Sequence, residues 1–165
     1  MENKVASPPS DTIYHDFKRK LTWNDFQGVP DMNHKGEAVT SSGFAFKWNA
    51  EDNGETVFIN ISVYCYFSKS NSWKKKMAHS DYHLRHEQHH FDITRLGAEK
   101  LVNEFKNASY TAENYKALIS QVFDRVYDEN LALQNEYDRQ TKHSIDKEKQ
   151  MEWNDLIGSK LMKLK

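Results

Sequence analysis

The chain of 165 residues contains very little cysteine. Its single cysteine, Cys65, excludes a disulfide within the chain and any zinc site built mainly from cysteines. If this protein binds zinc, histidine and carboxylate side chains must therefore supply the ligands.

Long apolar runs and an excess of one charge are also missing. No stretch approaches the roughly 18 apolar residues of a membrane span, and residues 1–10 are polar and contain Pro8-Pro9, unlike a signal peptide. A net charge of −1 offers no basic surface for nucleic acid or an anionic membrane. We therefore expect no membrane span and no nucleic-acid partner. A chain from which a signal peptide had been removed could have the same N-terminal residues, so the sequence leaves the compartment open. It also does not indicate the oligomeric state.

The chain does have many aromatic residues, 13% of the total, which supply large core side chains. Its length indicates one domain over residues 1–165. Within it, residues 1–20 are predicted to be a flexible or extended lead-in, because Pro8-Pro9 lies in a polar run.

Apolar periodicity predicts an α+β fold. Val39–Trp48 and Glu55–Phe67 alternate between apolar and polar residues, and Asn53-Gly54 between them is typical of a hairpin turn. Three helical stretches follow, which we predict over Asp81–Asn107, from a Thr111 cap through Tyr137, and over roughly Asp146–Met162. An N-terminal antiparallel hairpin followed by about three helices is the predicted architecture.

The first predicted helix carries the run His86-Glu87-Gln88-His89-His90. Because each helical residue turns the side chain by about 100°, His86 and His90 share one face and can ligate one zinc ion. Glu87 lies beside them, where a general base can reach a water activated by the metal. A shuffled sequence of this composition would contain the pattern at a rate of roughly 0.03.

Other histidines extend this pattern without strengthening it. His79 and His83 continue the stripe of His86 and His90 at helical spacing, which also fits a solvated histidine-rich face. Three ligands from one helix would strain tetrahedral geometry, so we place His79 and His83 beside the cleft or in solvent. His89 points away from the pair, and we expect no catalytic part for it.

A catalytic zinc site needs a third protein ligand and an open position. We favour His143, which lies in the polar joint between the second and third helices. The alternative is a carboxylate from a following helix, and on spacing alone the candidates are Glu104, Glu113, Asp124, Asp128, Glu129 and Glu136. Asp138 and Asp92 are possible partners that fix a histidine tautomer, although Asp92 lies on the opposite face from His90 and is first a fold residue.

Six blocks of the chain resemble a bacterial family of predicted secreted zinc-dependent proteases, a group named as a family of unknown function. They are Leu21–Asp31, Ala38–Gly43, Ser72-Trp73, Leu84–Ile93, Tyr137–His143 and Glu148–Asn154. The resemblance implies a zincin-like fold with the metal motif on the first long helix, a site that includes the Tyr137–His143 block, and a secreted or periplasmic location. Where the family usually reads Thr-Asn-His-Gly, this chain has Thr141-Lys142-His143-Ser144, which removes a glycine suited to positive φ.

The expected function is a zinc metallopeptidase that hydrolyses peptide bonds in a peptide or protein substrate. One Zn²⁺ per chain is held by His86, His90 and His143, and Glu87 is the general base. Tyr137 is the candidate donor to the oxyanion of the attacked carbonyl; otherwise it is a core tyrosine. The alternative function is a non-catalytic zinc-binding or interaction module on the same scaffold.

Overall fold

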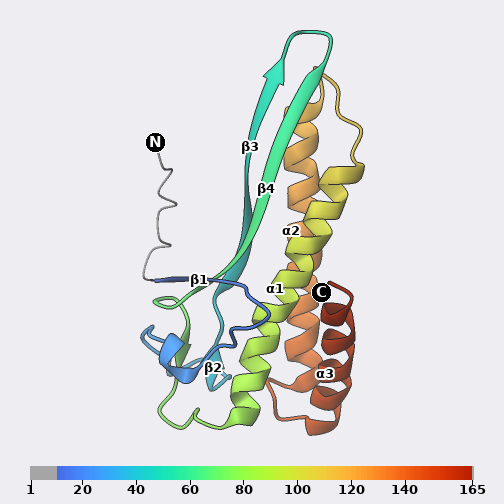
Figure 1. Ribbon diagram of the computed structural model, residues 1–165. Coiled ribbons are helices and arrows are strands. Elements are labelled where there is room, and N and C mark those ends of the chain that lie inside the picture. Colours follow the sequence, from blue (N-terminus) through green and yellow to red (C-terminus); the bar gives the residue numbers. More distant parts are fainter. Residues whose placement is uncertain (1–10, 165) are drawn as a thin grey trace.

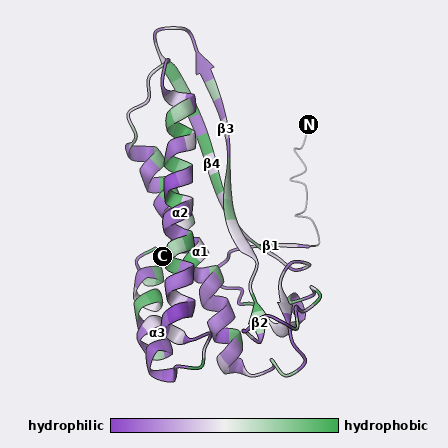
Figure 2. Cartoon of the chain, turned by 180° about the vertical axis from the view of Figure 1, so that it is seen from behind, coloured by the Kyte–Doolittle hydropathy of each residue, from purple (hydrophilic) through white to green (hydrophobic). Residues whose placement is uncertain are grey.

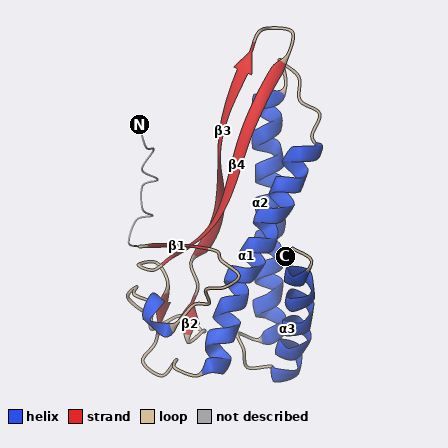
Figure 3. Cartoon of the chain, in the orientation of Figure 1, coloured by secondary structure: helices blue, strands red, loops and turns tan. Residues whose placement is uncertain are grey.

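The computed structural model describes residues 11–164 and has α+β architecture, as predicted, with antiparallel strands first and three helices after them (Figure 1, Figure 3). A short 3-10 turn, η1 (Trp23–Asp25), lies between the first two strands. The other elements are β1 (Thr12–Tyr14), β2 (Ala38–Val39), β3 (Ser42–Asp52), β4 (Val57–Ser68), β5 (Trp73–Lys74), α1 (Asp81–Asn107), α2 (Tyr115–Thr141) and α3 (Lys147–Met162).

The predicted hairpin is confirmed as β3 and β4, which pair antiparallel with Phe44 opposite Cys65. Gly54 in the connecting turn has φ of 86°, a conformation that glycine adopts without steric cost. β1 pairs with the other edge of β4, which gives the order β1-β4-β3. The first predicted strand is divided in the structure, because Ala38–Val39 pairs separately with β5 in a two-stranded sheet.

Capping side chains mark the start of α1 and of α3. The Ser80 side chain accepts a hydrogen bond from the His83 N–H and starts α1 at Asp81, as predicted. The second helix begins at Tyr115 and not directly after Thr111. Thr111 and Asn114 instead exchange side-chain to backbone hydrogen bonds in the turn before it. The α3 cap is Asp146, which accepts from the Lys149 N–H.

Helix α1 contacts the long hairpin and both other helices, and the upper part of α2 also lies beside the hairpin (Figure 1). One core packs the hairpin on α1 and α2, and a second core joins α1, α2 and α3 around Tyr137. Hydrophobic colour accordingly recurs along β4 and along parts of the helices (Figure 2). Since α1 belongs to both cores, its motif is carried on a rigid element.

Gly97 of α1 marks a close approach of two other elements to this helix. A Cβ atom there would lie 2.5 Å from Asn130 Nδ2 of α2 and 2.7 Å from the Phe44 ring of β3. Asn130 Nδ2 donates to the Ile93 carbonyl at 2.9 Å. Gly97 therefore lets both neighbours contact the α1 backbone.

In the part of the predicted lead-in that the structure describes, residues 11–20, Thr12–Tyr14 form β1 and residues 18–20 are exposed; residues 1–10 lie outside the described chain. His15 Nε2 lies 3.1 Å from Asp92 Oδ1, and the Leu21 N–H donates to Gln88 Oε1 at 2.7 Å. Asp92 is thus a fold residue, as expected. Among residues 11–164, no helix has both the length and the apolar character needed to cross a bilayer.

Candidate metal centre

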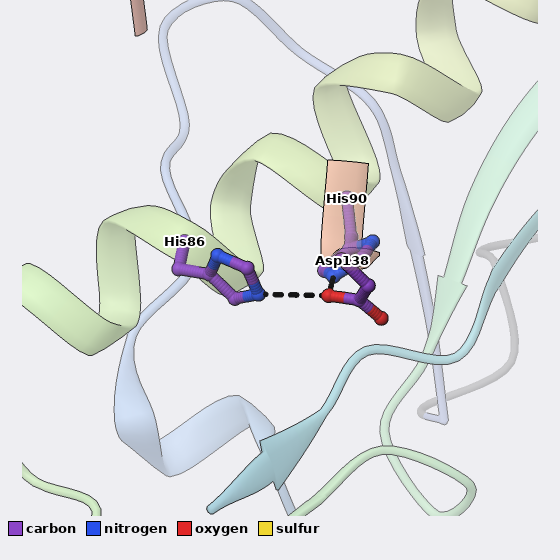
Figure 4. Close-up of side chains that lie close together, drawn as sticks. All are labelled: His86, His90 and Asp138. Carbon is purple, nitrogen blue, oxygen red and sulfur yellow. Dashed lines mark hydrogen bonds and ion pairs between the residues drawn. The ribbon is translucent and has the colours of Figure 1, made fainter. Parts of the chain in front are cut away.

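Two histidines of α1 and one aspartate of α2 converge in the structure (Figure 4). Asp138 Oδ1 lies 3.1 Å from His86 Nε2 and 3.0 Å from His90 Nε2. The three ligand atoms all lie within 4.8 Å of one another. The predicted pair His86 and His90 therefore faces a carboxylate from the next helix.

Two glutamines determine which nitrogen of each histidine faces this point. His86 Nδ1 lies 2.8 Å from Gln150 Oε1, and His90 Nδ1 lies 2.6 Å from Gln134 Oε1. A carbonyl oxygen only accepts, so each Nδ1 carries the hydrogen, and Nε2 of the neutral ring keeps a lone pair for a metal.

The orientation of both glutamine amides follows from their other hydrogen bonds. Gln134 Nε2 donates to the His90 carbonyl at 2.9 Å and to Thr94 Oγ1 at 3.0 Å. Gln150 Nε2 donates to Tyr137 Oη at 2.7 Å and to Asn154 Oδ1 at 2.9 Å. In each case the amide nitrogen is occupied elsewhere, and the oxygen is left for the histidine.

The cluster without a metal is a carboxylate between two imidazoles. Burial alone would raise the pKa of Asp138, but hydrogen bonds from His86 and His90 outweigh it and hold that pKa well below its usual range. For His90, burial lowers the pKa, yet the hydrogen bond and charge of Asp138, with the charge of Glu87, raise it to about 9. A proton and a metal ion therefore compete for Nε2 of His90.

The three side chains fit a zinc ion. Two imidazole nitrogens and one carboxylate oxygen form a common catalytic zinc set, which leaves a fourth position for water. With bonds of about 2.0–2.2 Å, tetrahedral ligand atoms lie about 3.4 Å apart. The observed 3.0–3.1 Å between the carboxylate oxygen and each nitrogen is close to that spacing.

Glu87 lies beside the cluster and lines the same cavity as His86 and His90. Its side chain is buried, and Oε2 accepts a hydrogen bond from Thr40 Oγ1 at 2.6 Å. The same hydroxyl lies 3.1 Å from the Glu87 carbonyl oxygen. Thr40, which lies between β2 and β3, therefore fixes the position of the Glu87 carboxylate beside the cluster.

His143 reaches the cluster but is not one of the three converging ligands. Its Nδ1 lies 3.4 Å from Asp138 Oδ1, and its side chain, which is 37% exposed, lines the cavity. Its role as a metal ligand stays a prediction.

The turn that carries His143 has left-handed backbone at three successive residues. Lys142, His143 and Ser144 have φ of 51°, 52° and 73°. Ser144 therefore adopts positive φ although the glycine usual in the resembling family is missing. The N–H groups of Lys142 and His143 donate to the Asp138 carbonyl, and Tyr82 Oη donates to the Ser144 carbonyl at 2.7 Å. These bonds hold a conformation that costs about 1–2 kcal/mol for each such residue.

Tyr137 lies behind the histidines and does not line the cavity. It is fully buried, its ring stacks on His86 with centroids 4.6 Å apart, and its hydroxyl donates to the His86 carbonyl at 3.3 Å. A substrate carbonyl cannot reach that hydroxyl in this structure. The predicted oxyanion role therefore has no geometric support, and Tyr137 instead positions His86.

The carboxylate that reaches the site is not among those expected on spacing. Glu104 and Glu129 pair with Arg125, and Glu136 pairs with Arg139. Asp138, suggested only as a partner that fixes a tautomer, instead meets both Nε2 atoms. No spacing signal in the sequence identified it, because which face of α2 meets α1 depends on how the helices pack.

The remaining histidines of the motif region lie as expected. His83 lines the cavity, His79 is exposed, and His89 Nδ1 points to Asp92 Oδ2 at 3.2 Å. The cavity itself has a volume of about 270 Å³ and lies between α1, α2, the segment 34–44 and the turn at residues 143–144.

Comparison with known proteins identifies a family for this chain but no individual related protein. Searches of curated proteins and of solved structures found no match to this chain. The family described as "Bacterial protein of unknown function (DUF922)" matches residues 27–144, a span that holds α1, α2 and all three converging side chains. The chain belongs to this bacterial family of unknown function.

Proposed function

We propose that this protein is a zinc-dependent metallopeptidase whose zinc ligands are His86, His90 and Asp138. One observation carries the proposal: two Nε2 atoms face the same carboxylate oxygen, and a glutamine oxygen at each Nδ1 leaves Nε2 as the metal-binding nitrogen of the neutral ring. This is the arrangement that a metal-binding histidine pair requires. The resemblance to predicted secreted proteases is what suggests action on peptides outside the cytoplasm.

The chain's own residues supply the proton transfers of the proposed reaction. A bound zinc ion contributes Lewis acidity, which lowers the pKa of water to about 7 and polarises the attacked carbonyl. Glu87 takes a proton from the attacking water as the oxygen bonds to the carbonyl carbon. It then gives that proton to the leaving amine nitrogen as the carbon–nitrogen bond breaks.

His143 takes the role first considered for Tyr137. Its ring faces the cavity beside Asp138, where it can donate a hydrogen bond to the carbonyl oxygen that becomes negative. The left-handed backbone at Lys142, His143 and Ser144 supports this assignment, because strained residues persist where surrounding contacts hold them and cluster at functional sites.

The decisive variant is Glu87→Gln, which removes the base but none of the proposed ligands. We expect it to keep one zinc per chain and to lose peptide hydrolysis by a factor of at least about 10². Zinc content and cleavage of a broad peptide mixture are the two measurements. Glu99→Gln on the same helix, where Glu99 pairs with Arg95 away from the cavity, is the matched control and should change neither.

The alternative, a non-catalytic zinc-binding module, predicts a different result. Wild type and Glu87→Gln would then bind zinc equally and both leave every peptide intact. Hydrolysis by wild type that survives in Glu87→Gln would also contradict the proposed role of Glu87.

A further inference from the structure

The cavity extends from the metal cluster along one face of α2. Asp138, Gln134, Leu131 and Tyr127 are separated by four, three and four residues, so they form one stripe of the helix, and all four line the cavity. The stripe changes from polar beside the cluster to apolar farther away. The polar end of the cavity therefore holds the proposed metal site, and the other end is suited to binding an apolar group of a ligand.

Helix geometry gives the distance between these ends. At a rise of 1.5 Å per residue, Leu131 lies about 10 Å along the axis from Asp138, and Tyr127 lies about 16 Å from it. An extended peptide advances about 3.3 Å per residue. An extended chain that runs from the cluster along α2 thus brings its third residue to Leu131.

The opposite wall runs beside this stripe over a similar length. Thr40 contacts Glu87 at the cluster, Ser42 Oγ lies 2.7 Å from Thr94 Oγ1, and the Phe44 ring lies 6.2 Å from that of Tyr127. The five residues from 40 to 44, which are joined by four steps of about 3.3 Å, span about 13 Å when extended. Both walls therefore lead from the cluster to the same apolar end.

This wall also has unpaired backbone groups. β3 pairs with β4 on one side only among the described strands, and the Ser68 N–H donates to the Ser41 carbonyl at 2.9 Å. Hydrogen-bonded pairs alternate along an antiparallel ladder, so the backbone groups of Ser42 and Phe44 point away from β4. Such an edge can pair with an extended peptide.

The apolar end is open to solvent, unlike the rest of the core. Tyr127 and Leu131 are 47% and 49% exposed, while Phe44 beside them is buried. Exposed large apolar side chains that line a cavity mark a binding site, because a ligand that covers them removes apolar surface from water.

We propose that this cavity is a specificity groove for an extended peptide with a large apolar side chain about three residues from the cleaved bond. Leu131 and Tyr127 contact that side chain, and the free edge at Ser42 and Phe44 holds the peptide backbone. The inference rests on the proposed function for the position of the cut, but binding in the groove does not depend on turnover.

Binding tests the groove without hydrolysis. Zinc-loaded Glu87→Gln protein is immobilised and offered a mixture of random-sequence peptides, and the retained peptides are identified by mass spectrometry. We expect enrichment of Phe, Leu and Met, and at least a tenfold loss of retained peptide when Leu131→Glu or Tyr127→Ser is added. Leu156 of α3 is similarly exposed, so Leu156→Glu is the matched control and should retain the peptides.

Equal retention by the Leu131→Glu and control proteins, or retained peptides without apolar enrichment, would overturn the inference. Thermal melting of each variant shows whether it is folded. Since Leu131 and Tyr127 are both about half exposed, we expect both substitutions to leave the melting temperature nearly unchanged.

Cleavage by the wild-type enzyme separates this inference from the proposed function. Cuts with an apolar residue enriched at one position, about three from the broken bond, support both. Cuts without such a preference overturn the groove and leave the peptidase. Apolar peptides retained through Leu131 but never cut overturn the peptidase and leave the groove as a peptide-binding site.

Discussion

The side chains that orient the rings of His86 and His90 come from α2 and α3, whereas both histidines lie on α1. Gln134 of α2 and Gln150 of α3 hold the two Nδ1 atoms, and Asp138 of α2 meets the two Nε2 atoms. The two glutamines orient the histidine rings, whereas Asp138 is a proposed metal ligand. Substitution of a glutamine and substitution of Asp138 should therefore have different effects, which can be measured separately.

The third ligand can be identified by zinc affinity. We expect Asp138→Asn to weaken zinc binding by at least about 100-fold, because it removes a charged ligand, and His143→Ala to weaken it by less than about 10-fold. Competition with a chromophoric chelator measures both. A larger loss in His143→Ala than in Asp138→Asn would restore His143 as the ligand.

The raised pKa of His90 predicts opposite effects of pH on the metal-free protein and on zinc binding. Folded His90 keeps its proton up to about pH 9, whereas in the unfolded chain it loses the proton near pH 6.5. This group therefore stabilises the metal-free fold fully below about pH 6.5, and the contribution is lost as pH rises to about 9. Zinc needs the deprotonated ring, so zinc affinity should rise across the same interval.

Thermal melts with chelator and with zinc, at pH 6.5 and pH 9, check this prediction. The gap between the two melting temperatures should widen at the higher pH. His90→Gln, which cannot titrate, is the control and should remove most of the change. A gap that narrows as pH rises would contradict the account.

Ser144 has positive φ, which predicts a stabilising substitution. Ser144→Gly should raise the free energy of unfolding by about 0.5–1 kcal/mol, because glycine adopts this conformation without the cost borne by serine. Ser144→Ala keeps the Cβ atom and should give no such gain. Urea denaturation of both variants measures the change in the free energy of unfolding. An equal increase in Ser144→Ala would contradict the explanation by backbone strain.

At the scale of elements, the contact of α1 with α2 and β3 depends on Gly97. Gly97→Ala should destabilise the protein by about 1–3 kcal/mol, because the new methyl group meets Asn130 and Phe44 within 2.7 Å. Gly158 of α3 has nothing within 4 Å of its Cβ position. Gly158→Ala should therefore be neutral or stabilising under the same denaturation, and equal losses in the two variants would contradict the packing argument.

Elements set by local signals were predictable from the sequence. Both ends of α1 were predicted correctly, since the Ser80 cap and the apolar periodicity are encoded within the helix itself. The start of α2 was placed too early, because Thr111 caps a turn before the helix and not the helix. β5 was missed and β2 was predicted only as the start of the β3 strand, since a strand of two residues is too short to show alternation of its own.

The site was predictable only where one element carries it. His86, Glu87 and His90 lie on a single helix, and their spacing identified them. Asp138, Gln134 and Gln150 became visible only in the structure, because which face of α2 and α3 meets α1 depends on how the helices pack. The burial of Tyr137 between α1 and α3 follows from the same packing.

At the scale of the whole molecule, one helix serves two cores and one site. The hairpin packs on α1 and α2, α3 packs on the same two helices in the second core, and the cluster joins α1 and α2 (Figure 4). The cavity therefore has a rigid floor on α1 and walls on α2 and β3.

The zinc content of the purified protein tests the central claim most directly. After zinc is supplied without chelators and excess metal is removed, we predict about one zinc per chain in wild type and far less in a His86→Ala, His90→Ala double variant. A wild-type content below about 0.1 zinc per chain, or equal content in the double variant, would contradict the assignment of this cluster as a zinc centre.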